Sequence, residues 1–334
     1  MAINRNVIIF GATGDVGSAA ALQAHQEGAN VTLAVRDTTK PIPKLSSYTF
    51  NKIAADLTKP ETVEAAVRKS GATVAFIYVV GDGKMRDSLR ALRDGGIENV
   101  VFLSSFTVVG DIRSTPSSDF IAFRHAQVEI ELEEVFGQEN FVAIRPAYFS
   151  SNSLASKQGI IEGKVELPNP DAEFDFISPD DVGRVSGKIL AHGGPEHVVG
   201  IVGRERLALK DAMGVIGSVL GKSIQVVRIG EEDALKQMCD IGIPPPVAAW
   251  MVHDAVHDAG KSLRAAEYPE ALGNVLKYTG NAALSLEQST AVRQFWAWST
   301  GVGANVVEEN EDLAGIAGED LGGEDLVDEF PFDQ

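Results

Sequence analysis

A glycine-rich turn that directly follows a short apolar run constrains the fold of this chain more than any other feature. Residues 7–21 read VIIFGATGDVGSAAA, with glycines at positions 11, 14 and 17. Gly11 permits a tight exit from a strand, Gly14 lets a pyrophosphate approach the backbone, and Gly17 allows a helix to pack closely on a sheet. Because the N-terminus of that helix presents unpaired N–H groups, the turn predicts a nucleotide-binding site.

Strand-like and helix-like segments alternate along the first 150 residues. We expect strands at 6–12, 30–36, 48–57, 73–80, 99–106 and 141–149, and helices at 15–27, 60–70, 84–95 and 119–136. Continuous apolar and β-branched runs are typical of strands that are buried on both faces, and helices between them favour parallel pairing. The sequence therefore predicts an α/β fold with a Rossmann doubly wound parallel sheet.

After residue 150 the alternation is less regular. We expect a hairpin-like stretch first, then a helix from Pro179 to about Leu190, a strand at 197–203, and helices at 208–220, 231–240, 246–266 and 285–299. The predicted domains are a cofactor-binding domain at 1–150, which segment 176–203 rejoins, and a smaller, mostly helical substrate lobe at 151–304. An acidic tail at 305–334 completes the chain.

The charge of the chain is concentrated in that tail. The net charge is −18, and residues 305–334 hold eleven Asp or Glu residues and no Lys or Arg. We expect the tail to be disordered, either as a solvated extension or as an arm that docks on the chain itself or on a partner. The remainder is mildly acidic, which argues against nucleic-acid binding.

The cysteine content and the hydropathy of the chain indicate the cellular compartment in which we expect the protein. The single cysteine, Cys239, excludes an internal disulfide, and the longest apolar stretch, VAFIYVV at 74–80, is too short to span a bilayer. The N-terminus also has no secretory signal pattern. We therefore expect a cytoplasmic protein without membrane attachment.

The end of the second expected strand bears on the choice of nucleotide. The sequence LAVRD places Arg36 nineteen positions after Gly17, followed by Asp37. A guanidinium group at this point suits a ribose 2′-phosphate, whereas an acidic residue would bond a free 2′-hydroxyl. Arg36 favours NADP(H), and Asp37 keeps NAD as the alternative.

The motifs GATGDVG, AVRD, ADL, FLSSF, AIRPAYFSSN and ISPDDVGRVSGKIL, in this order, resemble the NmrA-like branch of the atypical short-chain dehydrogenase/reductases. The resemblance covers about residues 1 to 300 and implies a cofactor site with NADP(H). It places these residues at the cofactor: Gly11, Thr13, Gly14, Asp15, Val16, Gly17, Arg36, Asp56, Leu57 and Pro146. It also implies that Ser104 and Tyr148 border the nicotinamide end, and that Asp181 caps a helix or anchors the lobe.

The sequence departs from the pattern of the family that it resembles where the catalytic residues are expected. Short-chain dehydrogenases use a Tyr with a Lys four residues later, and Tyr48 and Lys52 have this spacing only on the third strand, the wrong place in such a fold. Many NmrA-like reductases have a Lys at the position of His125. We therefore expect His125, Ser104 and Tyr148 to serve substrate polarisation and proton delivery, unless the chain has lost this chemistry.

Three functions follow from these patterns. The first is an NADPH-dependent reductase of a ketone, enone or quinone group on a hydrophobic, aromatic small molecule, acting as a monomer or homodimer. The second is a redox-sensing regulator that binds NADP(H) without turnover, and the third is a non-redox, isomerase-type enzyme on the same fold. No metal is expected, because His253 and His257 have a metal-ligand spacing but no nearby third ligand in an HExxH-like frame.

Overall fold

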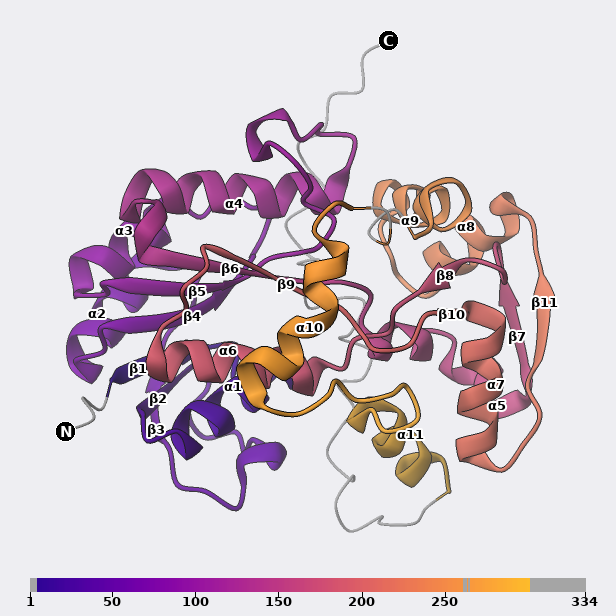
Figure 1. The fold of residues 1–334 in the computed structure, drawn as a ribbon, viewed down its shortest axis with the longest axis horizontal. Helices are drawn as coiled ribbons and strands as arrows, with labels where there is room; N and C mark the ends of the chain where they lie inside the picture. The colour runs from indigo at the N-terminus through magenta and orange to yellow at the C-terminus, as the bar shows by residue number, and fades with distance from the viewer. Residues whose placement is uncertain (1–4, 261–262, 264, 301–334) are drawn as a thin grey trace.

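Seven parallel strands form the central sheet of the computed structural model, which describes residues 5–260, 263 and 265–300. Their spatial order is β3 (Asn51–Ala54), β2 (Asn30–Val35), β1 (Asn6–Phe10), β4 (Val74–Tyr78), β5 (Asn99–Leu103), β6 (Phe141–Pro146) and β9 (Val198–Ile201) (Figure 1). The chain winds outward in both directions from β1 and β4. This order confirms the predicted doubly wound fold, in which ligands bind beyond the carboxyl ends of the strands.

Helices cover both faces of the sheet. Successive side chains of a strand point to opposite faces, so the apolar residues of one strand contact both layers of helices. Val7 and Ile9 pack toward α1 (Asp15–Gln26) and α6 (Pro179–His192). Ile8 and Phe10 pack toward the opposite layer, which is formed by α2 (Pro60–Ser70), α3 (Arg86–Gly95) and α4 (Phe120–Phe136). Both faces are therefore dry, which explains the continuous apolar strand sequences.

The contact between α1 and α6 is unusually close. A Cβ atom on Gly183 would lie 2.4 Å from Cβ of Ala19, and one on Gly187 would lie 2.5 Å from Cβ of Gln23. The two glycines lie one helical turn apart on α6, so they form the strip that α1 packs against. Helix α6 follows the first segments of the second lobe in the sequence. In space, however, it packs with α1 on the central sheet.

The second lobe is mostly helical, as predicted, and also contains two small sheets (Figure 1). Its elements are η4 (Ser150–Leu154), α5 (Lys157–Glu162), β7 (Lys164–Leu167), β8 (Glu173–Phe174), β10 (Leu207–Ala208), α7 (Leu209–Leu220), β11 (Gln225–Arg228), α8 (Glu231–Asp240), α9 (Pro245–His253), η5 (Asp254–Asp258), α10 (Tyr268–Thr279) and α11 (Thr290–Thr300). Short η turns also occur in the first part of the chain, namely η1 (Pro43–Leu45), η2 (Ile112–Ser114) and η3 (Gln138–Asn140).

Four expected elements differ from the structure. The hairpin-like stretch is wrong: β7 pairs in parallel with β11, and β8 pairs antiparallel with β10. The strand expected at 48–57 is limited to β3, because only these residues pair with β2. The helix expected at 246–266 ends after η5, where Gly260 has a positive φ of 69°. The helix expected at 285–299 begins only at Thr290.

The sequence analysis missed α10 altogether. This helix has Pro269 in its first turn and ends at Gly280, whose φ is 72°. It packs on β9 and α6, and the Asn274 side-chain amide donates to the Gly200 carbonyl at 2.8 Å. The chain therefore returns from the second lobe to the sheet. Within the described residues, no helix has the length and hydropathy to span a membrane. The tail at 305–334 lies outside the described residues.

Candidate functional site

Two glycines of the β1–α1 turn are required by the packing of the chain itself. Gly11 has a φ of 73°, and a Cβ atom there would lie 2.7 Å from the Tyr78 ring. A Cβ atom on Gly17 would lie 2.1 Å from the Gly11 carbonyl oxygen. Gly11 and Gly17 thus bring the start of α1 close to the strand ends.

Gly14 differs from the other two glycines. It is exposed, it is the N-cap of α1, and no side chain caps the helix there. A Cβ atom on Gly14 would meet only the Gly11 carbonyl oxygen, at 3.5 Å, which is an ordinary contact. The fold therefore does not require a glycine at this position. Its missing side chain leaves the N–H groups of α1 accessible from outside, which suits an anion.

The charges beside this helix terminus include one that the sequence analysis missed. Lys44 of η1 lies 2.7 Å from Asp15 and 3.8 Å from Asp180. Asp15 alone would repel a phosphate at the α1 terminus, and Lys44 offsets that charge. Thr13 is exposed in the turn, whereas Val16 is buried beneath it. No motif in the sequence places Lys44 here, because η1 reaches α1 only through the tertiary fold.

The loop after β2 contains two charged residues, Arg36 and Asp37, whose surroundings differ. Arg36 is exposed. The Asp37 carboxylate accepts hydrogen bonds from the Thr39 N–H at 2.9 Å and the Thr39 hydroxyl at 2.6 Å. These bonds lower the pKa of Asp37 and hold its carboxylate in a local turn. Asp37 is therefore engaged within its own loop, next to the exposed Arg36.

Asp56 and Leu57 follow β3, next to Arg36. Partial burial acts to raise the pKa of Asp56, but hydrogen bonds from Thr58 and the nearby charges of Lys59 and Arg36 lower it overall. Leu57 is buried, and its carbonyl accepts the Ser88 hydroxyl at 2.5 Å. The structure thus places Asp56 and Arg36 within electrostatic range of each other.

Ser104 lies in a buried charged network. Its hydroxyl donates to Oε1 of Glu129 at 2.5 Å, and Arg145 binds both oxygens of the same carboxylate at 3.0 and 2.5 Å. Arg145 also donates to the Val108 carbonyl at 2.9 Å. Glu129 is 1% exposed, so this network joins α4 to β5 and β6 from within. The Ser104 hydroxyl group therefore already donates its proton to a hydrogen bond within this network.

His125 lies on α4, with its ring 6.2 Å from that of Phe102 on β5. Burial lowers the pKa of His125 to about 4, and the charges of Arg124 and Arg145 act in the same direction. Nδ1 lies 2.7 Å from the Ile121 carbonyl oxygen, so a neutral ring carries its proton there. At neutral pH, His125 therefore offers Nε2 only as an acceptor.

Pro146 and Tyr148 lie at the carboxyl end of β6. The Pro146 carbonyl accepts the Phe106 N–H at 2.9 Å, and the Tyr148 ring stacks on Phe174 with centroids 4.1 Å apart. Burial, followed by the charge of Asp254, raises the pKa of Tyr148 well above its usual range. Tyr148 therefore stays a neutral phenol at any physiological pH.

The structure also locates Tyr48, Lys52 and Asp181, which the sequence analysis singled out. Tyr48 is exposed and the Lys52 ammonium donates to the Lys40 carbonyl at 2.6 Å, so these two form no catalytic pair. Asp181 accepts the Leu284 N–H at 2.7 Å and pairs with Arg184, which ties the second lobe to α6.

The His253 and His257 rings lie 4.8 Å apart. The part of the chain that the structure describes holds no group of three His, Cys, Asp or Glu residues arranged for a metal ion.

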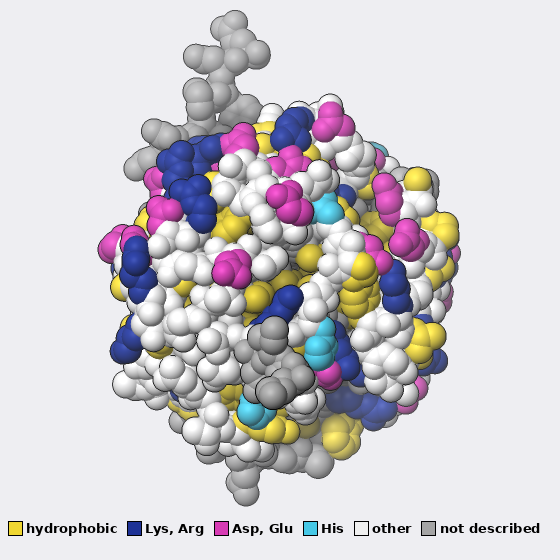
Figure 2. Space-filling view, turned by 60° about the vertical axis from the view of Figure 1, so that its left-hand side comes forward, with side chains coloured by type: hydrophobic (Ala, Val, Ile, Leu, Met, Phe, Trp, Pro, Cys, Tyr) yellow, Lys and Arg dark blue, Asp and Glu magenta, His cyan; other side chains and the backbone are white. Residues whose placement is uncertain are grey.

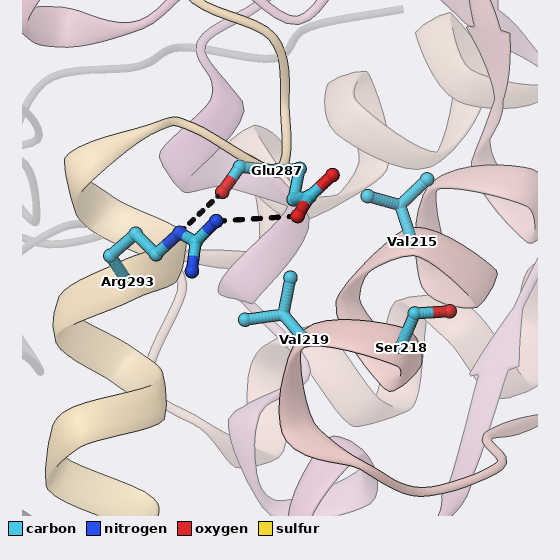
Figure 3. Close-up of a pocket in the computed structure, with 5 residues that line it drawn as sticks. All are labelled: Val215, Ser218, Val219, Glu287 and Arg293. Carbon is cyan, nitrogen blue, oxygen red and sulfur yellow. Dashed lines mark hydrogen bonds and ion pairs between the residues drawn. The ribbon is translucent and has the colours of Figure 1, made fainter.

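Of two cavities, one lies away from these residues and the other lies next to Lys44. One, of about 390 Å³, is lined by Val215, Ser218 and Val219 of α7, with the paired side chains of Glu287 and Arg293 opposite (Figure 3). The other, of about 290 Å³, lies beside α1 and is lined in part by Lys44 and Asp180. Among the described residues, both acidic and basic side chains occur on the face shown in Figure 2.

Comparisons with known proteins agree with this architecture. The model of the NmrA-like family matches residues 4–272. A nitrogen metabolite regulation-like protein, bik4, from Gibberella fujikuroi is 36% identical over 84% of this chain and 94% of that protein. An NAD(P)H azoreductase from Xenophilus azovorans is 24% identical over 83% of this chain and 94% of that protein.

Among solved structures, the NADPH-dependent quinone oxidoreductase QOR2 of Escherichia coli, complexed with NADPH, has a TM-score of 0.68. The sequence identity is 18%, and the match covers 86% of this chain and 99% of that one. At this identity the likeness shows a common fold.

Proposed function

The chain belongs to the NmrA-like family, and on this basis we propose that it is an NADPH-dependent reductase of a ketone, enone or quinone group on a hydrophobic small molecule. Its cofactor would bind across the carboxyl ends of β1 and β2. The structural neighbour QOR2, an NADPH-dependent quinone oxidoreductase complexed with NADPH, supports this proposal, as does the azoreductase relative.

The geometry of Gly14 carries the cofactor part of the proposal. The fold requires Gly11 and Gly17 but not Gly14, so an exposed glycine at the uncapped start of α1 is explained by what approaches from outside. An anionic pyrophosphate fits this helix terminus. Arg36 would hold the 2′-phosphate, since Asp37 is engaged by Thr39.

The residues present fit NADP(H) as a whole. Thr13, Asp15 and Val16 surround Gly14 at the helix terminus, and Asp56 and Leu57 border the adenosine end. When bound, the cofactor supplies a hydride. Pro146 and Tyr148, at the end of β6, would border its nicotinamide end and exclude water with their apolar surfaces.

A second candidate is an NADP(H)-binding regulator without turnover. One observation favours it: the three side chains expected to deliver a proton are engaged in the fold. Ser104 donates to Glu129, His125 is neutral and bonded to Ile121, and Tyr148 is a partly buried, neutral phenol whose ring stacks on Phe174. The regulation-like relative from Gibberella fujikuroi is consistent with this candidate.

Cofactor turnover separates the two candidates. The full chain is titrated with NADPH, then mixed with naphthoquinones and aromatic ketones while the reduced-nicotinamide absorbance is followed. The reductase proposal predicts NADPH binding and oxidation that depends on the added carbonyl compound. NADPH binding without oxidation by any compound of the panel would refute the reductase and favour the regulator.

A further inference from the structure

A buried carboxyl group lies beside the expected nicotinamide end of the site, where the sequence analysis expected no acid. Asp175 follows β8 and is 1% exposed. Its Oδ1 accepts the Tyr148 N–H at 3.4 Å, which is a long hydrogen bond. Its Oδ2 has no hydrogen-bond partner in the part of the chain that the structure describes. An orphaned buried oxygen is costly, so it needs an explanation.

The backbone fixes this carboxyl group in place. Phe176, the next residue, has a φ of 25°, which is strained for a bulky side chain. A Cβ atom on Gly203 would lie 1.5 Å from the Asp175 carbonyl oxygen, so only glycine fits there. Strain of this kind persists only where surrounding structure enforces it, and it is concentrated at functional sites.

Aromatic residues flank Asp175 in the sequence, and Tyr148, whose N–H donates to Asp175, packs on both of them. Tyr148 stacks on Phe174 and meets the edge of Phe176 at 5.4 Å. Tyr268, at the start of α10, meets Phe106 edge-on at 6.3 Å, and the charge of Asp175 raises the pKa of Tyr268. These side chains come from the carboxyl ends of β5 and β6 and from the second lobe. A flat aromatic ligand with one polar atom suits such surroundings.

Few charges offset the burial of Asp175. Burial raises the pKa of Asp175 to about 6. Hydrogen bonds from the Tyr148 N–H and from the N–H of Asp175 itself, and the charge of Arg206, act in the opposite direction but do not offset the burial. Arg206 is itself paired with Glu173 at 2.6 Å. Among the residues that the structure describes, the phenols of Tyr148 and Tyr268 also lie nearby; the charge of Asp175 acts on Tyr268, and the charge of Asp254 acts on Tyr148.

We propose that Asp175 hydrogen-bonds the carbonyl or quinone oxygen of the substrate and gives it a proton. This inference rests on the proposed reductase function and replaces His125 as the proton source. Reduction of a carbonyl group adds a hydride to carbon and a proton to oxygen. NADPH supplies the hydride when bound. The Asp175 O–H bond breaks as the substrate O–H bond forms, and the carboxylate regains a proton from water.

Quinone binding in the absence of turnover tests the proposal. The full chain is loaded with NADP⁺, and 1,4-naphthoquinone is titrated by tryptophan fluorescence between about pH 5 and about pH 8. In the wild type, the affinity should fall about tenfold per pH unit above the pKa of the acid that donates the hydrogen bond. In Asp175→Asn the amide still donates but does not titrate, so the affinity should be independent of pH. Asp175→Leu should bind weakly at every pH.

The matched control is Asp171→Asn. Asp171 lies four residues earlier, is exposed and pairs with Lys210 at 2.6 Å, so this variant should keep the wild-type pH profile. A flat profile in the wild type, a sloping profile in Asp175→Asn, or no quinone binding at any pH would overturn the role of Asp175. Failure of NADPH itself to bind would instead overturn the proposed function, and a direct titration of the same samples detects it.

Discussion

Replacing Asp175 by Asn should change how the stability of the protein depends on pH. The ordinary pKa of this carboxyl is 3.8, and burial raises the pKa to about 6 in the folded protein. The folded state therefore holds its proton more tightly than the unfolded state does. Consequently the free energy of unfolding falls as the pH rises through this interval, and stays low above it.

The size of the effect follows from the shift. A difference of about two pKa units, at about 1.4 kcal/mol each, amounts to about 3 kcal/mol. Asp175→Asn cannot ionise and avoids this loss. Relative to the wild type, its free energy of unfolding should therefore rise by about 3 kcal/mol between about pH 4 and about pH 7.5.

Urea unfolding at several pH values, followed by circular dichroism, measures this difference directly. Asp171→Asn should not show the rise, because Lys210 and Arg228 lower the pKa of Asp171 instead of raising it. Parallel stability curves for the wild type and Asp175→Asn would refute the reasoning, since they would mean that Asp175 titrates alike in the folded and unfolded states.

Three further substitutions test the site and its support. Gly17→Ala should destabilise the protein by about 1–3 kcal/mol or more in thermal or urea unfolding, because its Cβ atom would lie 2.1 Å from the Gly11 carbonyl oxygen. Gly14→Ala should cost under about 1 kcal/mol of stability yet weaken NADPH binding about tenfold or more, as calorimetry would detect; unchanged affinity would contradict our interpretation of this glycine. Glu129→Gln should cost about 3–5 kcal/mol in urea unfolding, because Arg145 is left buried without its counter-charge; a loss below about 1 kcal/mol would contradict that network's role.

The central sheet could be predicted from the sequence because its signals are local. Most of its strands contain an apolar run, and Pro60 and the glycine turn around Gly14 mark where helices begin. The second lobe lacks such signals. Strand β7 has four residues and pairs with β11, nearly sixty positions later, through contacts that no local pattern encodes. Helix α10 had usable signals in Pro269 and Gly280, which were overlooked.

The candidate site likewise combines features that the sequence alone indicates with features that only the folded structure reveals. The glycine turn between β1 and α1 and the position of Arg36 directly after β2 could be read from the sequence, since both follow from local patterns; the role of Arg36 at a cofactor stays a prediction. The states of Ser104 and His125 could not, because Glu129 and the Ile121 carbonyl engage them only within the folded protein. Asp175 gave no signal because a lone Asp beside Phe residues has no motif, and only its burial and orphaned oxygen distinguish it.

Cofactor discrimination tests the central claim most directly. Binding of NADPH and NADH to the full chain is measured by calorimetry, in the wild type, in Arg36→Ala and in Arg90→Ala, a surface arginine of α3 that serves as the control. The account predicts that the wild type prefers NADPH. Arg36→Ala should lose about tenfold to a hundredfold in NADPH affinity, because one charge-assisted contact is removed, while its NADH affinity is unchanged. Equal NADPH affinity in Arg36→Ala and Arg90→Ala, or no binding of either nucleotide, would contradict it.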